Sequence, residues 1–254
     1  LEGLFAGTGA EMPNGIGIVG GMPGSAISIA RVVKTDIAAR LAAGTALPDR
    51  LKEIEGELEW LASKHTRSPI LAGDVWFHSW QGGGGYGDPL LRDPARAAED
   101  LKRGAISNDA VEDIYGVSFA DGGEVDDVGT RAKREAIRAL RRARAKQRDP
   151  GDAVVTYQGR GKIQIGPVLA VDTEADAVSC GQCGHRHCGT QDNLLAHLGR
   201  IDGPLTAAGP VRGEAYSRGR FALRMLVCTA CGTLVDVQVG LDGAPLSYAA
   251  PEIT

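Results

Sequence analysis

Two short cysteine pairs in the last third of the chain offer the clearest chemistry in this sequence. They are Cys180-Gly-Gln-Cys183 and Cys228-Thr-Ala-Cys231, and each is followed by a glycine. A CxxC turn points its two sulfurs to one side of the chain, and the following glycine lets backbone amides turn toward them. Four thiolates supply the tetrahedral set that a structural zinc ion requires, with no position left open for a catalytic water. We therefore predict one structural Zn²⁺ bound by Cys180, Cys183, Cys228 and Cys231.

Three residues beside the first pair leave another ligand set open. Cys188, His185 and His187 lie in the string CGHRHC at residues 183–188, and one of them could replace a cysteine of the four. The four-cysteine set is favoured because the paired spacing already closes the shell. The plain structural alternative is four reduced cysteines without a metal. Redox catalysis by a single CxxC is less favoured, since no thioredoxin-like βαβ pattern surrounds either pair.

Composition restricts the classes of protein and partner. The 254 residues suffice for one large domain, or for a medium domain with a small one. The net charge of -4 gives no whole-chain case for nucleic acid or an anionic membrane. No apolar stretch approaches the roughly 18 residues of a membrane span, and no leader reads as a signal peptide. Paired cysteines without an export signal indicate a reducing, cytoplasmic compartment.

The first half of the chain mixes expected strands and helices. The glycine-rich residues 1–25 predict looped or edge-strand backbone, and residues 25–33 predict a strand. Apolar residues at helical spacing predict a helix over residues 51–64. Residues 70–80 predict a strand entered through a Gly-Asp turn, with Trp76 and Trp80 on one face in a core or interface.

Glycine and proline mark the next elements. The block Gly82–Gly85 lacks the residues of a phosphate-binding loop, so by spacing alone we expect it to serve tight backbone packing. Asp93 as cap and Pro94 at the first position predict a short helix that ends at Gly104. Ser107 caps a second short helix, which ends at Gly116.

One histidine and two aspartates near the glycine block can be explained without a functional site. His78 lies on a predicted strand, where a single histidine is more often packed or solvated than functional. Asp74 and Asp88 could be paired carboxylates, but both lie in turns where aspartate caps backbone amides. No catalytic residue can be assigned from these positions.

A basic segment separates the two halves. Residues 131–148 hold nine Arg or Lys against one acid, Glu135, and a thin apolar stripe predicts a helix with a broad basic face. That face suits solvent, an acidic partner subunit or nucleic acid, of which nucleic acid is the least favoured. After the break at 149–152 the pattern becomes β-rich. Strands are predicted over residues 153–157, 162–165, 168–171, 221–227 and 233–239, with a small helix over 192–198.

These elements predict an α+β fold with three parts. Residues 1–126 form a mixed α/β N-terminal module, residues 127–150 a basic linker helix, and residues 151–254 a small β-rich zinc-ribbon-like domain.

The first 145 residues or so resemble the C-terminal part of the hydantoinase B/oxoprolinase family. In that family a GD-containing strand leads to GGGGYGDP, a short helix, a Ser turn and a helix ending in Tyr-Gly-Val. The matching strings here are Gly73-Asp74, Gly82 to Pro89, Arg92 to Arg103, Ile106-Ser107 and Tyr115-Gly116-Val117, with Gly20 to Ser25 similar to the family's GG-x-PG-S segment.

The cysteine-rich tail is similar to the small zinc-carrying subunit that accompanies hydantoinase-like large subunits in acetone and acetophenone carboxylases. This resemblance implies a structural subunit of an ATP-dependent ketone carboxylase, a complex that forms a β-keto acid from a ketone and bicarbonate. The implied partners are a hydantoinase A-like ATP-binding subunit and a hydantoinase B-like large subunit, which would carry ATP and a second divalent metal.

The resemblance also departs from the family in length. The family's metal-binding region is expected upstream of the residues present, and the chain begins at Leu1 rather than Met. Catalytic residues are therefore expected on another polypeptide or on an upstream part. Two other functions stay open: a subunit of an ATP-dependent amidohydrolase acting on a hydantoin or lactam, and a zinc-ribbon protein that binds nucleic acid.

Overall fold

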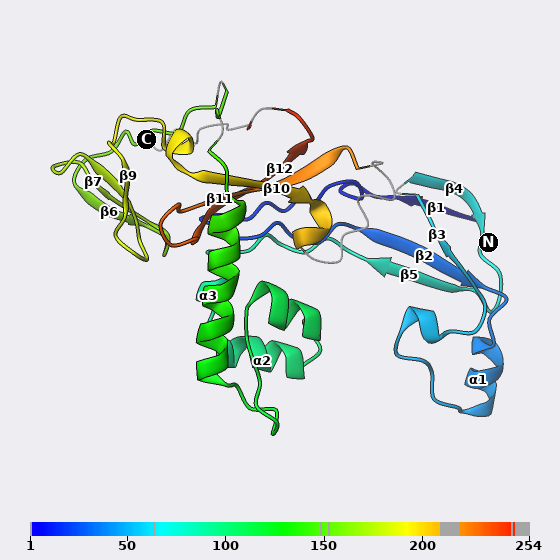
Figure 1. Cartoon of the computed structure of the whole chain (residues 1–254). Coiled ribbons are helices and arrows are strands. Elements are labelled where there is room, and N and C mark those ends of the chain that lie inside the picture. The colour runs from blue at the N-terminus through cyan, green and yellow to red at the C-terminus, as the bar shows by residue number, and fades with distance from the viewer. Residues whose placement is uncertain are drawn as a thin grey trace.

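The chain combines helices with small antiparallel sheets, and the predicted α+β class is confirmed (Figure 1). The computed structural model describes residues 2–62, 64–147, 149–151, 153–208, 219–244 and 246. Its strands are β1 (Glu2–Ala6), β2 (Ser28–Val33), β3 (Glu57–Trp60), β4 (Lys64–Pro69), β5 (Val75–Ser79), β6 (Lys162–Ile165), β7 (Leu169–Asp172), β8 (Ala177–Cys180), β9 (Arg186–Cys188), β10 (Gly199–Pro204), β11 (Phe221–Val227) and β12 (Leu234–Leu241). Its α-helices are α1 (Ile37–Ala43), α2 (Pro94–Lys102) and α3 (Asp127–Arg144), and its short helical turns are η1 (Leu51–Glu53), η2 (Pro89–Leu91), η3 (Ala110–Ile114), η4 (Leu194–His197) and η5 (Leu205–Ala208).

Strand β2 is the centre of the N-terminal three-stranded sheet, which has the order β3-β2-β5. Ile29, Ala30 and Val32 are buried on this strand. The β-branched residues suit a pleated surface that is covered on both sides. The strand predicted over residues 25–33 is thus confirmed over Ser28–Val33. β1 pairs separately with β4 in a two-stranded sheet.

The helix predicted over residues 51–64 is wrong. Only the 3₁₀ turn η1 forms there, and the chain then enters β3. Gly56 has φ 144°, and a β-carbon on it would lie 2.6 Å from the Val33 carbonyl oxygen. This glycine breaks the helical path and brings the next residues beside β2. Cross-strand ion pairs of Glu57 and Glu59 with the β2 side then favour the strand, so tertiary pairing overrides the helical period.

Strand β5 occupies only the second half of the strand predicted over residues 70–80. The turn before it has Gly73 at φ 89°, and the Asp74 carboxylate accepts a hydrogen bond from a backbone amide three residues earlier. Trp76 packs against the buried β2 side chains. Trp80 lies beyond the strand and is 70% exposed. Trp80 is therefore not part of the core of this chain, and its place in an interface stays a prediction.

The two short helices after the glycine block form as predicted. The Asp93 side chain caps α2 by accepting from a first-turn amide at 2.9 Å, and Pro94 occupies the first helical position. Gly104 follows the helix with φ 71°. Ser107 Oγ accepts from an amide at the start of η3 at 3.1 Å, and Gly116 follows at φ 63°. Both glycines adopt the left-handed conformation that ends a helix without strain.

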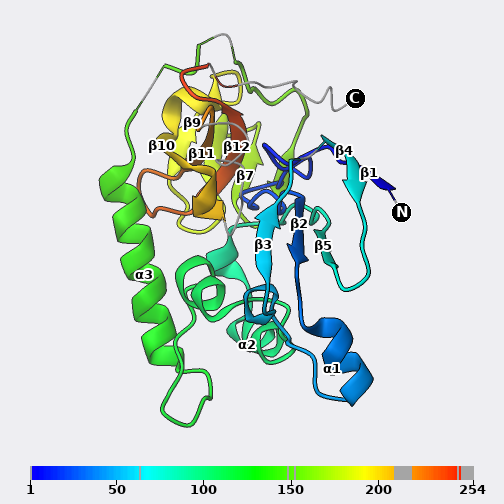
Figure 2. The same cartoon turned by 90° about the vertical axis from the view of Figure 1, so that its right-hand side faces the viewer.

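The basic segment forms α3, which runs along the outer edge of the molecule toward the C-terminal sheets (Figures 1 and 2). The helix begins at Asp127, the first residue of the predicted linker helix and four residues before the basic run, because the Asp126 side chain accepts hydrogen bonds from two first-turn amides at 3.0 Å. It ends at Arg144, while the predicted end, Arg148, lies outside the described residues. In the part of the chain that the structure describes, no helix combines the length and apolar character that would carry it across a bilayer.

Part of the predicted basic face of α3 turns toward the rest of the chain, whereas solvent, an acidic partner or nucleic acid was expected to cover it. Arg134 donates to the backbone carbonyls of Tyr115 and Arg92 at 3.1 and 2.7 Å. The apolar side chains of Val128 and Leu140 are 70% and 56% exposed instead. Arginine carries up to five donors on a long stem, so it can donate to backbone carbonyls that no apolar residue could satisfy. The inward basic face therefore serves the protein's own backbone.

The C-terminal region consists of a four-stranded sheet, β6-β7-β8-β9, and a three-stranded sheet, β10-β11-β12. The strands predicted over residues 162–165, 168–171, 221–227 and 233–239 are confirmed as β6, β7, β11 and β12. The strand predicted over 153–157 does not form, since its backbone bonds with the loop around Asn193 instead. The helix predicted over 192–198 is the short turn η4, with Asn193 as its cap.

The hydrophobic clusters cross the predicted three-part division. One cluster joins Ala26, which precedes β2, to Ile201, Leu223 and Leu234 of the C-terminal three-stranded sheet. A second lies between the four-stranded sheet and η4. The N-terminal glycine segment thus packs directly on the last sheet. The boundaries at residues 126 and 150 remain a prediction.

The glycine block serves tight backbone packing, as expected. Ile18 donates to the Gly85 carbonyl at 3.0 Å, and Gly85 donates to the Met22 carbonyl at 2.8 Å. A β-carbon on Gly84 would lie 1.7 Å from the Ile16 carbonyl oxygen. Residues 82–87 and 15–24 therefore run side by side at a distance that only glycine permits.

Replacing Gly84 with alanine is expected to destabilise the chain by about 1–3 kcal/mol or more, because the new methyl group overlaps backbone that cannot move aside. Gly83→Ala is the matched control, since nothing lies within 4 Å of its β-carbon position. Thermal unfolding of both variants would check this. Equal melting temperatures for the two variants would contradict the packing described.

Candidate metal centre

The two CxxC turns lie at the ends of strands in separate sheets. Cys180 is the last residue of β8, and Cys228 directly follows β11. The Cys180 amide donates to the His185 carbonyl at 2.8 Å, and the Cys228 amide donates to the Thr233 carbonyl at 2.9 Å. The glycine after each pair donates to the carbonyl of the first cysteine, at 2.9 and 2.8 Å. The same CxxC-Gly turn is thus built twice from unrelated flanking residues. We call these turns the first knuckle (residues 180–184) and the second knuckle (residues 228–232).

Both glycines have backbone conformations that the knuckles require. Gly184 has φ 73° and Gly232 has φ 76°, in the left-handed region where glycine is unstrained. Gly232 has a second constraint, because a β-carbon there would lie 2.5 Å from the Arg138 carbonyl oxygen of α3. The second knuckle is therefore pressed against the last turns of that helix.

The structure brings the four predicted cysteines together. Cys180 Sγ lies 3.7 Å from Cys231 Sγ, and Cys183 Sγ lies 3.9 Å from Cys228 Sγ. All four sulfurs lie within 4.8 Å of one another. Sulfurs at about 2.3 Å from a tetrahedral ion are about 3.8 Å apart, which matches these separations. The cluster therefore fits a metal ion such as zinc with one ligand from each cysteine.

The alternative ligands beside the first knuckle lie outside this cluster. Cys188 is buried in the hydrophobic core of the four-stranded sheet, and burial raises the pKa of its thiol to about 11. His185 is exposed and stacks edge-on against His187 at 5.4 Å. His187 is 8% exposed, and neither ring nitrogen has a hydrogen-bond partner among the described residues. The four-sulfur group forms without any of the three.

The thiols of the cluster perturb one another. A hydrogen bond from Cys228 lowers the pKa of Cys180 well below its usual range. The same hydrogen bond raises the pKa of Cys228, and burial raises the pKa of Cys183. The neighbouring thiols thus compete for the same protons. A divalent cation would remove this competition by accepting all the sulfurs as thiolates.

Asp88 has a role that sequence reasoning missed. Its Oδ1 caps η2 by accepting from the Leu90 amide at 3.0 Å, which confirms the turn-cap explanation. Its Oδ2 also accepts from Arg141 Nη1 at 2.8 Å and from the Leu234 amide at 2.9 Å. These partners lie 53 and 146 residues away, so no local pattern could reveal them. The Asp88 carboxylate therefore connects the glycine segment that contains it, residues 82–91, to α3 and to β12, the strand after the second knuckle.

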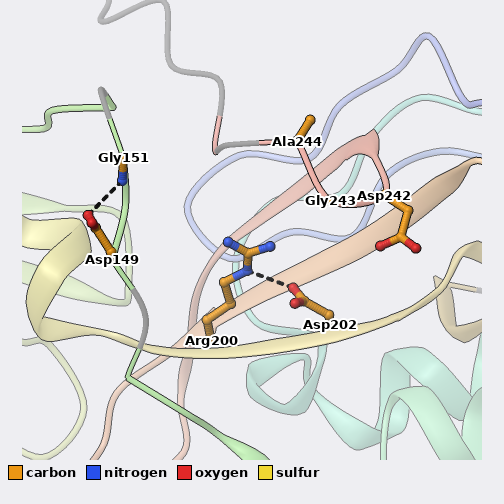
Figure 3. A pocket seen from close by; sticks show the side chains of 7 residues that line it. All are labelled: Asp149, Gly151, Arg200, Asp202, Asp242, Gly243 and Ala244. Carbon is orange, nitrogen blue, oxygen red and sulfur yellow. Dashed lines mark hydrogen bonds and ion pairs between the residues drawn. The ribbon is translucent and has the colours of Figure 1, made fainter.

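An open hollow of about 630 Å³ lies between β10, the turn after β12 and residues 149–151 (Figure 3). Arg200 Nε donates to Asp202 Oδ1 at 2.7 Å within it. Asp149 caps the Gly151 amide at 2.9 Å, as expected of the break after α3, whereas Asp152 lies outside the described residues. The arginine that lines the hollow and two of the aspartates that line it, Asp149 and Asp202, thus have hydrogen-bond partners within the chain.

Helices, antiparallel sheets and paired cysteine knuckles define an α+β chain with a candidate four-cysteine metal centre. No family model matches the chain. The acetone carboxylase alpha subunit of Xanthobacter autotrophicus is 36% identical over 76 residues, which are 28% of this chain and 10% of that protein. The caprolactamase subunit beta of Pseudomonas jessenii is 44% identical over 55 residues, which are 22% of this chain and 10% of that protein.

Among solved structures, nucleotide-free acetone carboxylase aligns with 57% of this chain and 21% of its own chain, at 25% identity and a TM-score of 0.46. The chain thus matches about a tenth of the length of the two curated relatives.

Cys183→Ser is expected to abolish stoichiometric metal binding, because it removes one of four ligands from the most exposed corner of the cluster. Cys188→Ala is the matched control and should keep about one metal ion per chain. Elemental analysis of both purified variants after dialysis against a weak chelator would measure this. Equal metal content in the two would contradict the assigned ligand set.

Metal binding is expected to release more than one proton per ion at pH 7. The pKa values of Cys183 and Cys228 are raised in the metal-free chain, so both thiols stay protonated there and must lose their protons to bind. Affinity should therefore rise with pH and fall as the solution is acidified. Indicator titration in weak buffer during zinc addition measures the release. An affinity that stays constant between pH 6 and 8 would exclude this protonation scheme.

Proposed function

We propose that this chain is a structural, non-catalytic part of an ATP-dependent carboxylase complex related to acetone carboxylase. The observation that carries the proposal is the 36% identity to an acetone carboxylase alpha subunit. The glycine packing of residues 82–87 supports it, since the GGGGYGDP string that resembles the hydantoinase B family has a definite structural purpose here.

The metal at the four-cysteine centre is proposed to be zinc in a structural role. Zinc accepts four thiolates in tetrahedral geometry, and four protein ligands leave no position for a substrate or a reactive water. The sulfur separations support this assignment. The centre would then link β8 of one sheet to the β11–β12 turn of the other and add a cross-link to the hydrophobic clusters of both sheets.

The proposed reaction of the whole complex is the joining of a ketone to bicarbonate to form a β-keto acid, with ATP as the energy source. A hydantoinase A-like subunit would bind ATP, and a hydantoinase B-like large subunit would hold the second divalent metal. This chain would hold subunits together rather than contact the reacting atoms.

A second candidate is a subunit of an ATP-dependent amidohydrolase that opens a lactam or hydantoin. The 44% identity to a caprolactamase subunit beta favours it. Both candidates share the same kind of multi-subunit partner. The nucleic-acid alternative loses its main support, because the arginines of α3 that face inward are bonded to the chain's own carbonyls and carboxylates.

The test is to purify the untagged chain from its native source, identify its partners by mass spectrometry and assay the intact complex. We expect large hydantoinase-like partners, about one zinc per chain, and ATP hydrolysis that requires both bicarbonate and a ketone, with labelled bicarbonate transferred to the product. Hydrolysis stimulated by a lactam without bicarbonate would favour the amidohydrolase. A chain that purifies alone would contradict membership of either complex.

A further inference from the structure

Two arginines at the end of α3 contact the backbone of the second knuckle. Arg142 Nη1 donates to the Cys231 carbonyl at 3.0 Å, and Arg141 Nη1 donates to the Gly232 carbonyl at 3.3 Å. These are the carbonyls of the second cysteine in the pair and of the glycine that follows it. Their direction depends on the turn that also aims the Cys228 and Cys231 sulfurs.

Helix α3 and the second knuckle pack in direct contact. The Arg138 carbonyl lies so close to Gly232 that a β-carbon could not be accommodated there. A knuckle that opened or rotated would therefore lose both arginine contacts at once or push the helix away. The position of α3 and the conformation of the second knuckle are mechanically coupled.

The coupling extends to the glycine segment through Asp88. Arg141 pairs with this carboxylate at 2.8 Å, and the two side chains are 11% and 0% exposed. Asp88 also accepts from the Leu234 amide, three residues after Cys231. Removing one partner of a buried ion pair leaves the other charge uncompensated, so the arrangement is held as a unit.

Charge favours the same arrangement when a metal is bound. Four thiolates around a divalent cation carry a net charge of about -2. Arg141 and Arg142 bring two guanidinium groups to the knuckle, each also paired with a carboxylate, Asp88 or Glu135, and both lie in the last turn, where basic side chains oppose the negative end of the α3 dipole. Arg144, which lies in the same last turn of the helix, is exposed.

We propose that Arg141 and Arg142 are positioning residues of the metal centre, which couple its occupancy to the docking of α3 and of the glycine segment. With metal bound, the second knuckle presents its carbonyls to the two arginines, and α3 and residues 84–91 are held in place. Without metal, the knuckle loosens, the arginine contacts weaken, and both segments open more often. The inference rests on the proposed metal centre and assigns it a role beyond the four cysteines.

The rate of metal release tests whether the arginine contacts hold the metal centre. Arg142→Gln is expected to speed zinc transfer to a chromogenic chelator about 10-fold, the lower end of the effect of removing an outer partner of a metal ligand. Arg144→Gln controls for loss of one positive charge in the same turn, and Glu135→Gln controls for loss of the Glu135–Arg142 ion pair. Both controls should stay within about twofold of the wild-type rate. Arg142→Lys, which keeps the charge and one donor, should restore part of the difference.

Hydrogen exchange measures the second half. Chelation of the wild-type chain is expected to lower amide protection in residues 138–145 and 84–91, with little change in α2. Linkage is reciprocal, so Arg142→Gln should shrink this metal-dependent difference, which a merely structural contact would leave unchanged. Equal metal-dependent protection in Arg142→Gln and the wild type, or equal release rates in Arg142→Gln and Arg144→Gln, would overturn the inference. A wild-type chain that binds no metal would overturn both the metal centre and the coupling, whereas stoichiometric metal with unchanged exchange would overturn the coupling alone.

Discussion

A carboxylate without solvent contact must find its hydrogen-bond donors inside the protein, and Asp88 finds them in three separate segments. The η2 amide of Leu90, the guanidinium of Arg141 and the amide of Leu234 all donate to it. The three donors belong to different parts of the chain. They lie in η2 directly after the glycine block, in α3, and in β12, which follows the second knuckle. Because a buried charge tolerates little loss of partners, these parts cannot shift independently. Asp88 therefore connects the glycine block to α3 and to the sheet that carries the second cysteine pair.

The glycine block and the cysteine centre both add contacts to the hydrophobic clusters where several small sheets meet. Where residues 15–24 and 82–87 meet, backbone packs on backbone, and side chains are excluded altogether. Where β8 and β11 end, four sulfurs converge beside the hydrophobic clusters of the two sheets. Small sheets bury little apolar area, so direct backbone contact and a metal link contribute what side-chain burial cannot.

Helix α3 connects these two regions by an unusual use of arginine. Its inward side chains satisfy carbonyls at the ends of other elements, which would otherwise be buried without donors. Its outward face carries Val128 and Leu140 instead. A charge-rich helix can therefore be an internal brace, and its basic composition is no direct indication of a nucleic-acid surface.

The sequence alone determined the features that depend on local chemistry: the CxxC-Gly knuckles, the Asp93 and Ser107 caps, and most strands of the C-terminal sheets. These follow from residue type and spacing over a few positions, where backbone conformation is set by near neighbours. Only the tertiary structure decided that residues 57–60 pair with β2 instead of forming a helix, and that the basic face of α3 turns inward. It alone revealed the partners of Asp88. Those outcomes depend on contacts between residues tens to more than a hundred positions apart, and the energy of such contacts has no trace in local periodicity.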